Sequence, residues 1–228
     1  MVYRAVAIFS GGKDSTYALH LAVLQNFKIV LLLTFSPELS HPWYLHRPFV
    51  EHTHIQAKLM GFKHVFVKIN AKDRLEEERG VRKALETLAD NHEFDYMILG
   101  IVGSDSQRML FLDIAEELGV KLYTPLWGKD RRSYLVELIR NGIEFVITSI
   151  TSWGIPMDIL GRVVTEQDAQ VILRRAMVYG FDPVFEGGEA ESFVVYAPLF
   201  RGRICIDGRK HILSDYEGYI VAENVYEC

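Results

Sequence analysis

Short apolar runs alternate with amphipathic stretches through the first half of the chain. The apolar runs are rich in Val, Ile, Leu and aromatic residues, and they predict strands covered on both faces, as in a parallel sheet. These strands are expected at residues 6–9, 29–35, 64–69, 96–102 and 121–126. The amphipathic stretches predict helices at residues 14–25, 49–60, 74–91 and 106–118. Repeated strand–helix–strand units favour an open, doubly wound parallel sheet of the α/β class, with right-handed crossovers.

Local signals agree with this pattern. Gly61 and Gly119 stand where glycines commonly end a helix. Glu78 and Arg82 have the four-residue spacing of a surface ion pair, and the acidic run 76–78 indicates a solvated helix surface. Residues 36–48 hold three prolines and no clear period, which predicts a long loop with a lid role.

The pattern changes beyond the fifth strand. Further elements are expected at residues 131–141 (helix), 144–150 (strand), 167–179 (helix), and 192–200, 203–206 and 218–225 (strands). Thr165 is a candidate N-cap, and Asp207-Gly208 is a candidate hairpin turn. A boundary is therefore expected near Trp127, between a domain of residues 1–127 and a smaller α+β domain of residues 128–228.

Composition excludes several classes of protein. Hydrophobic residues make up 49% of the 228 residues and charged residues 24%, which is ordinary for a folded chain and unlike a disordered one. The formal charge of −5 argues against a protein that grips nucleic acid without specificity. The longest apolar run, residues 29–35, is too short to span a bilayer, and residues 1–13 do not resemble a signal peptide.

Cysteine usage points to a reducing compartment. Cys205 and Cys228 are the only cysteines, and no CxxC pattern is present. We therefore expect neither a disulfide framework nor a cysteine-rich zinc site, and we expect a cytoplasmic location without membrane association. The histidines at positions 41, 46, 52 and 54 match no standard zinc spacing and are interpreted as surface residues or neighbours of a nucleotide.

The candidate chemistry is concentrated in residues 10–15, which follow a buried strand and open a helix. Gly11 and Gly12 let the backbone turn tightly and approach an anion, and the N–H groups at the helix start favour negative charge. Lys13 adds a positive charge, and Ser10 and Ser15 add hydroxyl donors. Asp14 would repel a phosphate unless a cation such as Mg²⁺ lies between them.

This spacing differs from the Walker A pattern. It resembles the SGGxDS signature of the PP-loop, or N-type ATP pyrophosphatase, superfamily, which has a HUP-like fold. The resemblance implies that ATP is cleaved between its α and β phosphates, with residues 10–15 binding ATP, Lys13 and Asp14 catalytic, and Asp14 on Mg²⁺. A glycine-rich turn without a ligand is the alternative.

Three further segments resemble the archaeal type of the diphthine–ammonia ligase family. Residues 100–108 are similar to that family's GAxxSDYQR, with Ser106 where Tyr is usual. Residues 123–130 are similar to LAYLWxRDQ. Residues 186–193 are similar to EGGEYETF, with Ala190 in place of Tyr. The resemblance implies amidation of diphthine on translation elongation factor 2, with ammonia and ATP as co-substrates and AMP and pyrophosphate as products.

The same resemblance suggests substrate-binding residues in two segments. They are Gly103, Ser104, Asp105 and Arg108, and Glu186, Gly187, Gly188 and Glu189. Carboxylates such as Glu186 and Glu189 suit the trimethylammonium group of diphthine, whereas the alternative is a solvated acidic turn. Ser104 or Asp105 could instead cap the next helix. The aromatic residues Trp153, Tyr179 and Tyr196 are expected in core packing rather than in a cation pocket.

Two rival functions stay open from the sequence. One is another PP-loop adenylating enzyme, such as a tRNA-modifying enzyme, and the other is a non-catalytic module that binds ATP or AMP. The cysteine content disfavours a thiolating enzyme, because such enzymes usually carry paired cysteines. No stable nucleic-acid partner is expected, and a homodimer is the expected assembly.

Overall fold

A computed structural model describes residues 2–39, 42–46 and 49–228 of the chain. The chain divides into two compact units. The first unit comprises the residues up to Ser10 together with Asp14–Trp127. The second comprises Gly11–Lys13 together with Gly128–Cys228. Among the described residues, no helix is both long enough and apolar enough to cross a membrane.

The first unit is built on a five-stranded sheet in which every neighbouring pair is parallel. The strand order is β3-β2-β1-β4-β5. The strands are β1 (Arg4–Ile8), β2 (Lys28–Pro37), β3 (His64–Ile69), β4 (Tyr96–Ile98) and β5 (Lys121–Tyr123). The predicted doubly wound α/β fold is therefore confirmed, with a reversal of strand order between β1 and β4.

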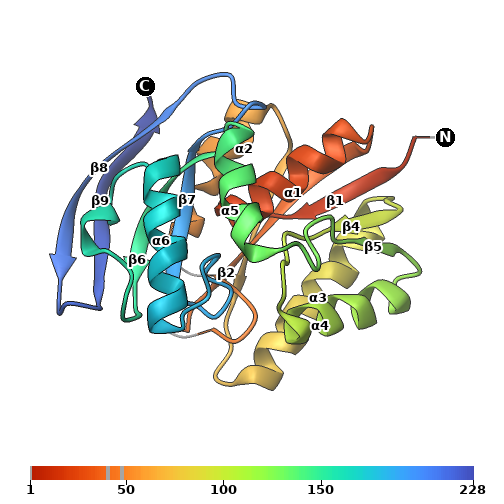
Figure 1. Ribbon diagram of the computed structural model, residues 1–228. Helices are drawn as coiled ribbons and strands as arrows, with labels where there is room; N and C mark the ends of the chain where they lie inside the picture. The colour runs from red at the N-terminus through yellow and green to blue at the C-terminus, as the bar shows by residue number, and fades with distance from the viewer. Residues whose placement is uncertain (1, 40–41, 47–48) are drawn as a thin grey trace. The chain divides into compact units, whose positions relative to one another are not determined.

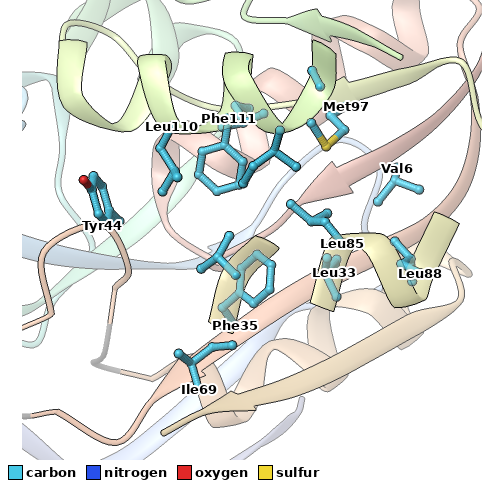
Figure 2. Packing of buried hydrophobic residues seen from close by; sticks show 14 of the residues in the cluster. Val6, Leu33, Phe35, Tyr44, Ile69, Leu85, Leu88, Met97, Leu110 and Phe111 are labelled. Carbon is cyan, nitrogen blue, oxygen red and sulfur yellow. The ribbon is translucent and has the colours of Figure 1, made fainter. Parts of the chain in front are cut away.

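Helices cover both faces of this sheet (Figure 1). They are α1 (Lys13–Leu24), α2 (Thr53–Met60), α3 (Arg74–Asn91) and α4 (Asp105–Glu117). Right-handed crossovers place α1 and α2 on one face and α3 and α4 on the other. Figure 2 shows the core beneath α3 and α4, where Leu85 and Phe111 meet Val6, Leu33 and Met97 from the strands.

Some elements differ from the predicted ones. Strands β4 and β5 end several residues earlier than their apolar runs. Strand β4 ends before Gly100, which passes directly against the backbone of α1. The predicted helix 49–60 begins as a 3-10 turn (Val50–His52) before α2. Phe49 precedes that turn with φ of 65°, which an α-helix does not allow.

The described part of the predicted loop after β2 is fixed by hydrogen bonds to two helices. Tyr44 is buried, and its carbonyl accepts a hydrogen bond of 2.8 Å from the Gln107 side chain. The Glu77 carboxylate accepts the backbone N–H groups of residues 43–45 at 2.8–3.0 Å. The prediction that residues 76–78 form a solvated surface is therefore wrong for Glu77, which is fully buried, although Glu78 does pair with Arg82 at 3.3 Å.

The second unit is an antiparallel sheet with two helices. The strand order is β7-β6-β9-β8. Its elements are α5 (Arg131–Arg140), β6 (Glu144–Ile150), the 3-10 turn Met157–Ile159, α6 (Glu166–Tyr179), β7 (Ala190–Tyr196), β8 (Ile204–Ile212) and β9 (Gly218–Glu227). Thr165 caps α6 as predicted, in a reciprocal capping box with Asp168.

The hairpin formed by β8 and β9 corrects two predictions. Asp207 and Gly208 lie inside β8 at a bulge rather than in a turn, and the chain reverses between residues 212 and 218. Cys205 and Cys228 form a disulfide, contrary to the expectation drawn from their distance along the sequence. The hairpin register places Cys205 opposite Tyr226, so strand pairing brings the two cysteines to a Cα–Cα distance of 5.8 Å.

Candidate active site

Residues 10–15, the glycine loop, connect β1 to α1 as the sequence predicts. The Ser10 and Ser15 hydroxyl groups lie 3.1 Å apart, and the Ser10 N–H donates to the Ser15 hydroxyl at 3.3 Å. Gly11 has φ of 77°, a conformation that favours glycine. The loop therefore turns directly into the N-terminus of a helix of 12 residues, where the helix dipole favours an anion.

Within the first unit, the structure brings the segment after β4 to this loop. A Cβ added at Gly100 would lie 2.4 Å from the Asp14 carbonyl carbon and 2.4 Å from the Ser15 nitrogen. Only glycine allows so close an approach of two backbones. Both segments leave the carboxyl ends of neighbouring strands at the point where strand order reverses, which is where open α/β sheets bind ligands.

The predicted substrate residues of this segment lie at the start of α4. Ser104 is the N-cap by its backbone position, although its side chain makes no capping hydrogen bond. Gly103 and Ser104 are partly exposed and Asp105 is exposed, so these positions are accessible. The Arg108 guanidinium stacks on the Trp127 ring, with its central carbon 4.6 Å from the ring centroid. This cation–π contact orients a cationic side chain at the carboxyl edge of the sheet.

Lys13 is held by residues of the second unit. Its side chain is only 3% exposed, and its ammonium donates a hydrogen bond of 2.6 Å to the Val184 carbonyl. The ammonium also lies 5.4 Å from the centroid of the Phe185 ring. The Lys13 N–H donates to the Ser192 hydroxyl at 3.2 Å, and the Gly11 carbonyl accepts the Val194 N–H at 2.9 Å. Strand β7 therefore fixes the backbone at both ends of the segment Gly11–Lys13.

The predicted residues Glu186–Glu189 belong to a tight turn, residues 182–189. The Glu189 carboxylate accepts the Asp182 N–H at 3.0 Å and the Gly187 N–H at 2.9 Å. Gly188 has φ of 80°, and Gly187 and Gly188 are both exposed. Glu186 is partly exposed. The structure therefore gives Glu189 a part in closing the turn, which its sequence motif does not reveal.

His20, in the helix that follows the glycine loop, carries no fixed charge. His20 lies in α1, and its Nδ1 lies 2.7 Å from the Thr16 carbonyl. Burial lowers the pKa of His20, so the ring is neutral near pH 7. The positive charge in the glycine loop is therefore that of Lys13.

The weaker sequence signals have mixed outcomes. Trp153 and Tyr179 are 58% and 51% exposed, so the prediction that they are core residues is wrong. Tyr179 instead packs against the Arg175 guanidinium, and Trp153 stacks on Tyr216. His41 lies outside the described residues. Among the described residues, no group of three or more His, Cys, Asp or Glu side chains is arranged to hold a metal ion.

Comparison with protein families covers nearly the whole chain. The model of the diphthamide synthase N-terminal domain matches residues 3–122, and that of the diphthamide synthase C-terminal domain matches residues 130–227. The chain belongs to the diphthamide synthase family. The family resemblance drawn from the three motifs is thus confirmed, and this assignment does not favour the alternative of a tRNA-modifying enzyme.

Several relatives of this diphthamide synthase family member are named diphthine–ammonia ligase. Those of Rattus norvegicus and Homo sapiens are each 23% identical, over 95% of this chain and 87% of the relative. That of Danio rerio is 24% identical, over 95% of this chain and 91% of the relative. Among solved structures, a predicted subunit of tRNA methyltransferase from Methanocaldococcus jannaschii is 17% identical, with a TM-score of 0.42 over 83% of this chain and 96% of that one.

Sequence reasoning missed two residues that hold Lys13. Val184 acts through its carbonyl, which leaves no signal in the side-chain pattern. Phe185 has φ of 66°, a conformation that non-glycine residues seldom adopt, and this too is invisible in the sequence. Ser192 is visible only as part of the motif 186–193.

Proposed function

We propose that this protein amidates the carboxylate of diphthine on elongation factor 2, using ammonia and ATP and releasing AMP and pyrophosphate. The observation that carries this proposal is the match of both diphthamide synthase domains to nearly all of the chain. The relatives act, by their name, as ligases on diphthine and ammonia. Formation of an amide from a carboxylate requires activation, for which ATP is the co-substrate.

The glycine loop suits the phosphates of ATP. Gly11 has a positive φ that favours glycine, Gly100 leaves room for the backbone of Asp14 and Ser15, and α1 begins within the loop, where the helix dipole favours an anion. Ser10, Gly12 and Ser15 complete the loop with donors, and Lys13 supplies positive charge. Asp14 is partly exposed and fits Mg²⁺, because this ion is commonly held by one or two carboxylates together with phosphate oxygens.

In the proposed mechanism, a carboxylate oxygen of diphthine attacks the α-phosphorus of ATP and pyrophosphate leaves. Lys13 and the loop amides stabilise the charge that develops on the departing pyrophosphate. Mg²⁺, when bound at Asp14, would neutralise further phosphate charge. Ammonia then attacks the carbonyl of the acyl-adenylate, AMP leaves, and the amide nitrogen loses a proton.

Two groups of residues are proposed to bind the protein substrate. Gly103, Ser104, Asp105 and Arg108 lie at the carboxyl edge of the first unit's sheet, where the Arg108 guanidinium suits a carboxylate or phosphate. Glu186, Gly187 and Gly188 are proposed to face the trimethylammonium group, with the Glu186 carboxylate supplying negative charge, whereas both carboxylate oxygens of Glu189 are engaged by backbone N–H groups of the turn. The glycines of this turn leave room for the substrate backbone.

The products of ATP cleavage test the proposal. Protein, ATP, Mg²⁺, ammonium and diphthine-modified elongation factor 2 should together yield AMP, pyrophosphate and an amidated histidine, measured by nucleotide chromatography and mass spectrometry. We expect Lys13→Ala to lower the rate of pyrophosphate release at least about tenfold, as for loss of a transition-state charge contact. ADP and orthophosphate as products, or an unaltered rate for Lys13→Ala, would contradict the proposal.

A further inference from the structure

The 182–189 turn is a connected set of hydrogen bonds that ends at the Lys13 ammonium. Glu189 closes the turn by accepting two backbone N–H groups through its two carboxylate oxygens. Asp182 accepts the Val184 N–H at 3.0 Å through one oxygen and the Arg131 guanidinium at 2.6 Å through the other. Both carboxylates therefore fix the peptide segment that presents the Val184 carbonyl.

Burial and backbone hydrogen bonds restrict the orientation of the Val184 carbonyl. Val184 is fully buried and Phe185 is 6% exposed, and the positive φ of Phe185 sets the direction of the preceding carbonyl. The Phe185 N–H donates back to the Asp182 carbonyl at 3.0 Å, and the Gly188 N–H donates to the Phe185 carbonyl at 3.2 Å. The strained conformation of Phe185 persists because these bonds over-determine it.

We propose that Glu189 is a positioning residue for Lys13, acting through the 182–189 turn and the Val184 carbonyl. The carboxylate keeps the turn closed, the turn aims the carbonyl, and the carbonyl holds the ammonium where it meets the phosphates of ATP. This inference rests on the proposed function, because it takes Lys13 as the residue that stabilises pyrophosphate. It predicts that a change at Glu189 lowers the rate of adenylation and leaves the affinity for the modified histidine unchanged.

The Glu189→Gln variant separates the two roles, since Gln has the same size but only one oxygen to accept a hydrogen bond. The amide NH₂ would face a backbone N–H and open one side of the turn. We expect the kcat for pyrophosphate release to fall about tenfold, because small displacements of catalytic groups cost one to two orders of magnitude in rate. The KM for the diphthine-modified protein should stay within about twofold, since uniform substrate binding is retained.

A double-mutant cycle with Lys13→Ala tests whether Glu189 acts through Lys13. Once the ammonium is absent, Glu189→Gln should lower the residual rate by less than about twofold, because residues that act as a unit are not additive. A further tenfold loss in the Lys13→Ala background would overturn the inference. A raised KM for the protein substrate with unchanged kcat would equally overturn it, since that result marks a substrate ligand.

A second variant disturbs the Glu189 carboxylate by a change at a neighbouring residue. A Cβ at Gly187 would lie 2.8 Å from a Glu189 carboxylate oxygen, so Gly187→Ala should displace the carboxylate and show the same non-additivity with Lys13→Ala. Glu166→Gln is the matched control, because Glu166 pairs only at the surface with Arg140 and should leave the rate unchanged. Absence of pyrophosphate release from the wild-type protein would instead remove the proposed function itself.

Discussion

Glu77 is the clearest case of a single residue that fixes a long loop. Its buried carboxylate accepts three consecutive backbone N–H groups from residues 43–45, and each of these groups would be unsatisfied without it. We expect Glu77→Gln to lower the free energy of unfolding by about 3 kcal/mol, since charged hydrogen bonds of this kind contribute about 1.5–3 kcal/mol and stranded donors add to the loss. Urea denaturation measures the change. Glu86→Gln, on the exposed side of the same helix, is the control, and equal losses for both variants would disprove the assignment.

The burial of Glu77 shows what sequence reasoning can and cannot supply at the scale of one residue. Glu77 precedes Val81 by one helical turn, and Val81 and Leu85 are fully buried, so the helical period was the signal for an inward-facing Glu77, although the acidic run 76–78 was predicted to be solvated. Its partners are backbone amides more than 30 residues earlier in the chain, and no side-chain pattern marks them. The Val184 carbonyl that holds Lys13 escaped prediction for the same reason.

At the scale of one element, the start of α6 has a charge network that depends on pH. Arg162 donates two hydrogen bonds to Asp168, at 2.6 and 2.8 Å, and Thr165 adds two more. These bonds, that of Arg162 foremost, hold the pKa of Asp168 well below its usual range. Asp168 therefore stabilises the fold above its unfolded pKa of about 3.9, and this stabilisation is lost as the pH falls through the lower folded pKa.

The Asp168→Asn variant tests this network. We expect it to lower the free energy of unfolding by about 1 kcal/mol at pH 7, the usual value of an N-terminal cap. The difference from the wild type should shrink below about pH 4, where the Asp168 carboxylate of the unfolded chain takes up a proton while that of the folded chain is still charged. Denaturation at a series of pH values measures it. Asp158→Asn removes the exposed partner of Arg162 and should lower the free energy of unfolding by less than about 0.5 kcal/mol. A larger loss for this variant would show that Asp158, rather than Asp168, is the main partner of Arg162.

Elements with a strong period were predicted well, and elements that end at tertiary contacts were not. The capped helix α6 and the five parallel strands follow from local signals. Strand β4 ends early because Gly100 must pass the backbone of α1, a demand from another part of the chain. The disulfide was missed because strand pairing joins residues 23 positions apart, and the spacing of Cys205 and Cys228 along the chain carries no sign of that pairing.

At the scale of the whole molecule, the sequence led to the family through motifs in both halves of the chain. The boundary expected near Trp127 coincides with the division into units, apart from Gly11–Lys13. These three residues continue the first strand and helix in sequence, yet their hydrogen bonds run to Val184, Ser192 and Val194. Sequence patterns reflect the contacts that a residue makes with its neighbours along the chain. They therefore could not show that Gly11–Lys13 form hydrogen bonds with residues of the second unit.

The path of one oxygen atom through the complete reaction tests the proposed chemistry. If the diphthine carboxylate attacks the α-phosphorus, one of its oxygens bridges carbon and phosphorus in the acyl-adenylate. Ammonia then breaks the bond between the carbonyl carbon and this oxygen, so the oxygen leaves with AMP. With substrate labelled by ¹⁸O in the carboxylate, we expect one labelled oxygen in AMP and the other in the amide, measured by mass spectrometry. Label in orthophosphate would indicate attack on the terminal phosphate, and unlabelled AMP would indicate that water, rather than the carboxylate, cleaves ATP.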